Sequence, residues 1–448
     1  MIILKLILFS GFLVTVMTSI VHAQFFEVCR TGCVDELIEN IKAHSAHTYR
    51  RDYKFDHIRY LQTPKLLPGV EPARLNDVLG FLDELNDLSK ATRLRKAAVL
   101  FFAYSKGQLC TWLLPPSSGK FRSHVASMKE EELRSLRPNL MNALRVTGKV
   151  NNRLPVPRGV KLADVPAPTG DVKKVLTETS NRLLPGPISQ GLLEEGIDTL
   201  VVVPISAIGT IPFAALPFRD QRLMDYVSVV VAPDFFAFQK RPMKAQHDFS
   251  NPIIIGDPEG EPDPKWEFPR LLGAREEAEA VAKDLKSHGL IGKEASKEKI
   301  KSRLRDQSKT GLVYLATHGI ADEENPLDGS FLMLSDGRWT AREMGKVNLK
   351  GYRPLVVMSA CQTGLGKDFD VGTIGMARAW QRAGASSVVM SLWNVDDTAT
   401  RDLMVNFMRL AAQKPPDKSL QEAMQVTRKD HPDPALWAGF SVFGAPEL

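Results

Sequence analysis

Short apolar runs alternate with amphipathic stretches from residue 252 onward. The apolar runs predict buried strands, and the amphipathic stretches predict helices. Gly384 predicts the end of the helix at 373–383. Such alternation is typical of a mostly parallel sheet with helices on its faces, where binding sites form beyond the carboxyl ends of strands. The expected strands are 253–255, 312–316, 355–359 and 387–392, and the expected helices are 274–285, 373–383 and 398–410.

The first half of the chain has a different pattern. Two apolar runs, 98–104 and 108–114, flank a short polar turn and predict a hairpin, and 199–204 predicts another strand. Leucines and valines recur at helical spacing within 75–85. We therefore expect an α/β fold with a short helical region at 24–95. A domain at 96–448 follows, divided into an α+β subdomain at 96–245 and an α/β subdomain at 252–448.

Residues 1–23 resemble a secretory signal. Lys5 is their one charged residue, an apolar run follows, and Val21-His22-Ala23 suits signal peptidase. The alternative is an uncleaved membrane anchor, since the run is close to the minimum length for spanning a bilayer. The sequence thus predicts an exported protein, periplasmic or secreted, with no stable membrane insertion after cleavage.

Composition agrees with a soluble globular fold beyond that segment. The 448 residues are 44% hydrophobic and 25% charged, with a net charge of +6. Because the basic residues are interspersed with acids, nucleic-acid binding is not expected. Dinucleotide-binding glycine patterns and the G-x-S-x-G nucleophile motif are absent from the sequence, and we expect no cofactor.

Four cysteines leave several roles open. Cys29 and Cys33 lack a matching second pair of ligands, so no metal site is expected. Export would permit disulfides, but the sequence does not fix how Cys29, Cys33 and Cys110 pair. Cys110 lies in an apolar run and is expected to be a small core residue.

Two reactive side chains follow predicted strands directly. His318 comes after the strand at 312–316, and Cys361 comes after the strand at 355–359, 43 positions later. If these strands are parallel neighbours, imidazole and thiol can share one cleft, and a thiolate with an imidazole can hydrolyse a peptide bond. The backbone N–H groups of Gly319 and Cys361 are the candidate oxyanion donors. Either residue alone is more often structural, and the pairing carries the hypothesis.

The motifs around these residues resemble the CHAT family of caspase-like cysteine peptidases. Ala-Thr-His-Gly at 316–319 looks like the family's histidine motif, and Ser-Ala-Cys-Gln-Thr-Gly-Leu-Gly at 359–366 looks like its cysteine motif. Further similar segments extend the resemblance over roughly 95–448. It implies a caspase-like fold, with His318 as general acid/base and Cys361 as nucleophile. Many relatives carry tetratricopeptide arrays, and none is visible here.

Three residues after the last strand are candidates for a substrate pocket. Asp396 and Asp397 would favour a basic residue before the cut, but one of them can instead cap the helix near Thr398, which we favour. Trp393 can line the same cleft or belong to the core.

The sequence therefore predicts a cysteine endopeptidase that acts on a protein or peptide substrate. One alternative is a caspase-like fold that serves as a non-catalytic binding or scaffold module. A second is a small-ligand-binding α/β domain in which His318 and Cys361 are incidental. The sequence leaves the substrate, the activation mechanism and the oligomeric state open.

Overall fold

A computed structural model describes most of the chain beyond the N-terminal region. The described residues are 37–38, 41, 74–89, 95–105, 107–144, 146, 171–239, 249–261, 263–306, 309–322, 325–349, 351–360, 366–369 and 372–447. The predicted signal at 1–23, Cys29, Cys33 and Cys361 lie outside these residues.

The described residues form eighteen strands and eleven α-helices with five short 3-10 helices. The strands are β1 Ala97–Ser105, β2 Gln108–Leu114, β3 Arg122–Ser127, β4 Thr199–Val203, β5 Pro217–Phe218, β6 Gln221–Arg222, β7 Ser228–Val231, β8 Ile253–Gly256, β9 Leu290–Ile291, β10 Leu312–Ala316, β11 Gly319–Ile320, β12 Phe331–Leu334, β13 Gly337–Thr340, β14 Leu355–Ser359, β15 Gly366–Phe369, β16 Gly372–Gly375, β17 Ser387–Ser391 and β18 Phe440–Gly444. The helices are α3 Leu75–Ser89, α4 Glu130–Ala143, α5 Val172–Leu183, α6 Gly186–Glu194, α7 Leu272–Asp284, α8 Lys297–Asp306, α9 Ala341–Met344, α10 Met376–Ala383, α11 Asp397–Ala411, α12 Pro416–Asp430 and α13 Pro434–Trp437, with η2 Ser206–Thr210, η3 Phe213–Ala215, η4 Leu223–Asp225, η5 Phe235–Gln239 and η6 Gly292–Glu294.

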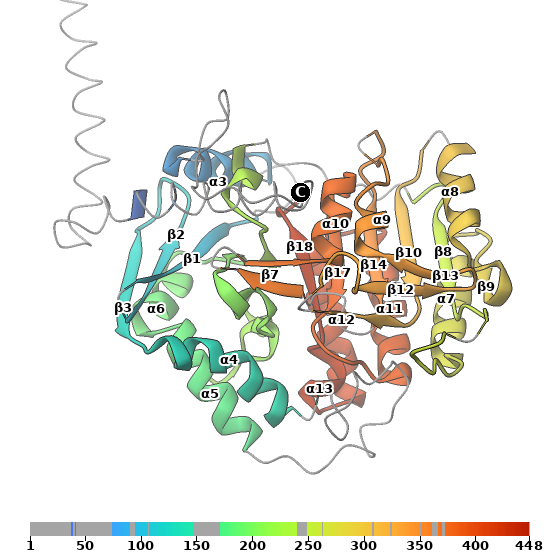
Figure 1. Cartoon of the computed structure of the whole chain (residues 1–448). Helices are drawn as coiled ribbons and strands as arrows, with labels where there is room; N and C mark the ends of the chain where they lie inside the picture. The colour runs from blue at the N-terminus through green and yellow to red at the C-terminus, as the bar shows by residue number, and fades with distance from the viewer. Residues whose placement is uncertain are drawn as a thin grey trace, which may run out of the picture.

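One large sheet runs through the described part of the chain. Its eleven strands follow the order β3-β2-β1-β4-β7-β18-β17-β14-β10-β8-β9. Strands β1, β4, β7 and β18 are parallel to one another, and so are β17, β14, β10, β8 and β9. The two groups meet at the antiparallel pair β17–β18, so their strands point in opposite directions. Figure 1 shows the N-terminal strands at one end of the molecule, β8 and β9 at the other, and β17 and β18 between them.

Helices cover both faces of this sheet. In Figure 1, α3, α9 and α10 lie on one side, and α4, α5, α11, α12 and α13 lie on the other. Alternate positions of the strands therefore face different cores. Leu200 and Val202 of β4 pack in the core under α4–α6, whereas Val201 and Val203 pack in the core under α3 and η5.

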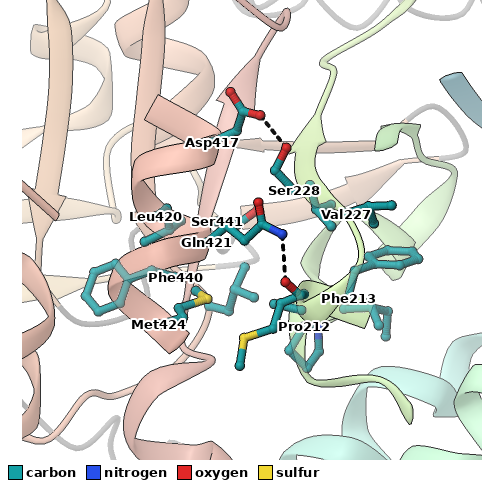
Figure 2. A pocket seen from close by; sticks show the side chains of 15 residues that line it. Pro212, Phe213, Val227, Ser228, Asp417, Leu420, Gln421, Met424, Phe440 and Ser441 are labelled. Atoms are coloured by element: carbon teal, nitrogen blue, oxygen red, sulfur yellow. Dashed lines mark hydrogen bonds between the residues drawn. The ribbon is translucent and has the colours of Figure 1, made fainter. Parts of the chain in front are cut away.

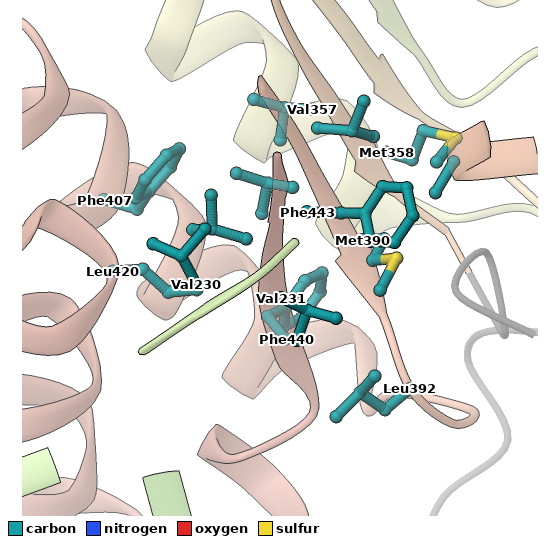
Figure 3. Close-up of a cluster of buried hydrophobic side chains, with 14 of the residues drawn as sticks. Val230, Val231, Val357, Met358, Met390, Leu392, Phe407, Leu420, Phe440 and Phe443 are labelled. Atoms are coloured by element: carbon teal, nitrogen blue, oxygen red, sulfur yellow. The ribbon is translucent and has the colours of Figure 1, made fainter. Parts of the chain in front are cut away.

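The centre of the sheet is packed with apolar side chains. Figure 3 shows Val230 of β7 on the side of the sheet that faces Phe407 of α11 and Leu420 of α12, and Met358, Met390 and Phe443 on the opposite side. All of them are buried. Burying apolar area contributes about 25 cal/mol per Å², so this core holds the two halves of the sheet together.

The fold class predicted from the sequence is confirmed. The strands expected at 253–255, 312–316, 355–359 and 387–392 are β8, β10, β14 and β17, and the hairpin expected at 98–114 is β1–β2. The helix expected from 373 begins instead at Met376, because residues 372–375 pair with β15 as strand β16. Gly384 ends that helix with a left-handed φ of 114°. The α3 helix lies inside the predicted helical N-terminal region.

Cys110 is buried in β2, as expected for a core residue. Across the described ranges, no helix is both long and apolar enough to cross a bilayer. The same ranges contain no group of three or more His, Cys, Asp or Glu side chains arranged to hold a metal ion.

Candidate active site

The strand ends that precede His318 and Cys361 lie side by side. β10 and β14 are parallel neighbours, with Ala316 paired to Ser359, as the sequence hypothesis required. Thr317 N also donates to Ser359 O at 3.3 Å, which extends the pairing one residue beyond the strands. His318 is the second residue after β10, and Cys361 is the second residue after β14. Cys361 itself lies outside the described residues, so its side chain is not located.

The end of β14 is fixed from the other side by β17. The Ser391 hydroxyl, at the end of β17, donates to the backbone carbonyl of Ala360. Both residues are fully buried. The residue immediately before Cys361 is therefore held between β10 and β17.

His318 is enclosed by the loop between β8 and α7. Its Nε2 lies 2.6 Å from the carbonyl oxygen of Pro269, and its ring lies against that of Phe268, with 4.9 Å between centroids. Because a carbonyl oxygen only accepts hydrogen bonds, Nε2 carries a proton. The neutral ring then has its basic lone pair on Nδ1. The residue is 4% exposed.

A small three-stranded sheet fixes the backbone of the same residue. Met333 N of β12 donates to His318 O at 2.9 Å, and the Thr317 hydroxyl donates to Met333 O. Gly319 faces Leu332 in the antiparallel pair β11–β12. Since the hydrogen bond lies at the preceding residue, this is a non-hydrogen-bonded pair, and the Gly319 N–H points away from β12.

A hollow of about 560 Å³ opens beside the imidazole. Its wall includes Trp266, Phe268, Thr317, His318 and Met333. A second cavity of about 30 Å³ lies between α12 and β7, where the Ser228 hydroxyl donates to Asp417 at 2.6 Å (Figure 2). Three strands separate β7 from β10, so this smaller cavity is not part of the candidate active site.

The base of the β8–α7 loop is closed by Asp257. This residue follows β8 and adopts a left-handed φ of 45°, which Asp tolerates better than most residues. Its carboxylate accepts hydrogen bonds from Leu271 N at 2.8 Å and from the guanidinium groups of Arg270 and Arg275. Burial alone would raise the pKa of Asp257, but hydrogen bonds from Arg270 and Leu271 hold it below its usual value.

The three candidate pocket residues have structural contacts. Asp396 caps α11 by accepting hydrogen bonds from Thr398 N and Ala399 N, at 3.0 and 2.9 Å. Asp397 accepts from Gly273 N, at the start of α7. Trp393 is 1% exposed and donates from its indole to Ala435 O at 3.0 Å. These contacts favour the capping interpretation for Asp396 and place Trp393 in the core.

The sequence reasoning missed the residues that surround the imidazole. Phe268 and Pro269 lie in a proline-rich loop, and Asp257 follows an apolar strand just as His318 does. That strand-end position was the available signal for Asp257. Nothing local marks Phe268 as a neighbour of His318, because the two are 50 positions apart and meet only in the folded chain.

Parts of this chain are similar to known proteins. Human tetratricopeptide repeat protein 28 is 24% identical over 323 residues, which cover 59% of this chain and 13% of that protein. The separase of Saccharomyces cerevisiae, in its securin complex, aligns with a TM-score of 0.48 and 11% identity over 83% of this chain and 31% of its own. The Arg-specific cysteine proteinase gingipain R (RgpB) of Porphyromonas gingivalis aligns with a TM-score of 0.42 and 12% identity. The alignment covers 71% of this chain and 75% of the gingipain chain.

The family model for the CHAT domain matches residues 173–445, which is more than half of the chain. The matched region contains β10, β14 and both strand ends of the candidate site. The resemblance expected from the histidine and cysteine motifs is thereby confirmed. The chain therefore belongs to the CHAT domain family.

Proposed function

We propose that this CHAT domain is a cysteine endopeptidase that cleaves a protein substrate, with His318 as general acid/base and Cys361 as nucleophile. The observation that carries the proposal is the matched register of two strand ends. Ala316 pairs with Ser359, so positions 318 and 361 follow two adjacent parallel strands by the same number of residues. Reactive residues at such strand ends are the usual components of sites in α/β sheets.

The hydrogen bonding of His318 supports its role. With Nε2–H held by the Pro269 carbonyl, Nδ1 is the nitrogen that can accept the thiol proton. The thiolate of Cys361 then attacks the scissile carbonyl carbon, and the imidazolium returns the proton to the departing amine. A water molecule next gives a proton to Nδ1 and attacks the thioester, which releases the acid and restores the thiol.

The negative oxygen of each tetrahedral intermediate needs hydrogen-bond donors. The Gly319 N–H is one candidate, because the β11–β12 pairing leaves it pointing away from β12. The Cys361 N–H is the second candidate, by the sequence argument. Donors of this kind contribute about 3 kcal/mol each to the stability of such an intermediate.

A thiol-directed peptide probe tests the assignment. The purified protein is incubated with a peptidyl acyloxymethyl ketone panel in the presence of reductant, and the adduct is quantified by intact mass. We expect one adduct in the wild type and in Cys110→Ala, which removes a buried thiol of β2. Cys361→Ala should give none, and His318→Gln should react at least about tenfold more slowly, because general base catalysis is lost.

The substrate is sought by comparing new N-termini in a proteome treated with wild type or with Cys361→Ala. Cleavage that depends on Cys361 supports the peptidase. Equal cleavage by both proteins contradicts the assignment. Probe labelling with no cleavage of any protein would favour the binding or scaffold module instead.

We also propose that the protein is exported and acts in the periplasm or outside the cell. The support is the signal-like sequence at 1–23, with its apolar run and Val21-His22-Ala23 junction. Fractionation and N-terminal sequencing of the native protein test this. A mature N-terminus at Gln24 is expected, and an intact N-terminus in the cytoplasmic fraction would contradict export.

A further inference from the structure

We propose that Asp263 and Arg338 form a positioning pair that holds the His318 ring in its working orientation. The inference rests on the proposed function and extends it to two residues that do not touch the reacting atoms. Asp263 belongs to the β8–α7 loop, and Arg338 belongs to β13. The pair therefore connects the two segments that enclose the imidazole.

The ion pair has the geometry of a strong contact. Arg338 Nε and one terminal nitrogen each donate to the Asp263 carboxylate at 2.7 Å, which makes a bidentate pair. The same carboxylate accepts from Lys265 N at 2.9 Å and Trp266 N at 3.2 Å. The Asp263 side chain is 4% exposed. The pair thus fixes the fold of the loop as well as its position.

Aromatic rings carry the contact from this pair to His318. The Arg338 guanidinium lies over the Phe331 ring, 4.6 Å from its centroid. Phe331 meets Phe268 edge to face at 6.3 Å, and Phe268 lies 4.9 Å from the imidazole. Cation–π and edge-to-face contacts of this kind have preferred geometries and therefore fix ring orientation.

Backbone contacts also link the two segments of this pair to His318. The β12–β13 hairpin that carries Arg338 also carries Met333, whose N–H binds the carbonyl of His318. The loop that carries Asp263 also carries Pro269, whose carbonyl binds Nε2. Separating Asp263 from Arg338 would therefore let the two attachments of His318 move independently. A catalytic group displaced by about 1 Å can cost 100-fold in rate.

The charges of the pair persist over the useful pH range. Hydrogen bonds from Arg338 hold the pKa of Asp263 below its usual value, and the Asp263 carboxylate raises the pKa of Arg338. Both groups stay ionised near neutral pH. The positioning contact is thus constant under assay conditions.

The test compares this pair with a matched one. Arg342 and Asp328 also form a bidentate pair, at 2.6 and 2.8 Å, only four positions further along. We expect Arg338→Gln and Asp263→Asn each to lower kcat by at least about tenfold while KM changes by less than about twofold, because the pair acts through the orientation of the group that transfers the proton. Arg342→Gln should leave both constants unchanged. Arg338→Lys keeps the charge but loses the bidentate fork, and should restore only part of kcat.

A double-mutant cycle and a spectroscopic readout complete the test. The double variant Arg338→Gln/Asp263→Asn should lose no more activity than either single variant, because both remove one interaction. The readout is the NMR signal of the His318 imidazole, which is identified by its absence in His318→Gln. This signal should shift or broaden in Arg338→Gln but not in Arg342→Gln. Urea unfolding checks that each variant is folded.

Each failure has its own signature. Unchanged kcat and an unchanged His318 signal in folded Arg338→Gln overturn the positioning role. Equal losses of kcat in Arg342→Gln and Arg338→Gln would also overturn the positioning role, since they would reflect general destabilisation. If the wild type shows no turnover that depends on Cys361, the proposed function fails, and the His318 signal still decides whether the pair orients the ring.

Discussion

Gly273 and Asp397 lie 124 positions apart, yet the Gly273 N–H donates to the Asp397 carboxylate at 2.6 Å. The contact joins the first turn of α7 to the first residue of α11, and the two helices pack along their length. A β-carbon at position 273 would lie 2.6 Å from Asp397 Cγ and 2.7 Å from its carbonyl oxygen. The two helices can approach this closely only because residue 273 has no side chain.

Gly273→Ala should therefore lower the free energy of unfolding by about 1–3 kcal/mol, the usual cost of overpacking. Urea unfolding followed by circular dichroism measures the change. Gly80→Ala is the matched control, because position 80 lies within α3 and its β-carbon would meet no heavy atom within 4 Å. That variant should be more stable than the wild type by about 0.5–1 kcal/mol. Equal stability of Gly273→Ala and the wild type would show that the helices can separate freely.

Asp396→Ala should lower the free energy of unfolding by about 1 kcal/mol, because it removes the cap of α11. Asp396→Asn should keep most of that stability, since its side-chain oxygen can accept the same bonds. If the protein has the proposed peptidase activity, neither variant should change which residue is preferred before the cut. A peptide panel in which Asp396→Ala loses a preference for Lys or Arg would instead support the substrate-pocket interpretation.

Asp257 should make the protein sensitive to acid. Its pKa is lower in the folded state than in the unfolded chain, so the unfolded chain binds the proton first as the pH falls. The stability that Asp257 contributes is fully present above its unfolded pKa of about 3.9 and is lost as the pH falls through the lower folded value. Urea midpoints of the wild type and Asp257→Asn should thus differ most near pH 7 and converge below about pH 4. A constant difference across this range would contradict the linkage.

Ionisation of Glu447 should lower the stability of the protein as the pH rises, which is opposite to the effect of Asp257. Burial raises its pKa above the usual value, so its ionisation opposes folding as the pH rises. Glu447→Gln stays neutral and can still accept the hydrogen bond that Ser387 donates at 2.8 Å. The variant should gain stability relative to the wild type between pH 4 and pH 7. Glu131→Gln, at an exposed position of α4, should show no such gain. A gain of equal size in both variants would exclude the burial of Glu447 as the cause.

The sequence predicted the features that depend on neighbouring residues. The strands that precede His318 and Cys361 are short apolar runs, and local periodicity is enough to find them. The cap formed by Asp396 was predictable for the same reason, since its partners are two and three residues away. The side-chain position of Cys361 stays a prediction.

Other features depend on partners that are distant in the sequence. Asp263 pairs with Arg338 across 75 positions, and no local pattern distinguishes these two charged residues from the many others in the sequence. Residues 440–444 are a short apolar run whose neighbours, β7 and β17, can be chosen only when the whole sheet assembles. Their pairing decides which way the two groups of strands point, and periodicity carries no information about it.

The position of β18 also determines when the large sheet can be completed during synthesis of the chain. It is the last strand to be synthesised among the described residues, yet it lies between β7 and β17 at the centre of the large sheet. A nascent chain still lacking β18 has two unjoined sheet fragments with exposed edges, which are prone to aggregate. Native structure is therefore completed only after residues 440–444 have left the ribosome, and a chaperone that shields those two edges would protect the chain until then.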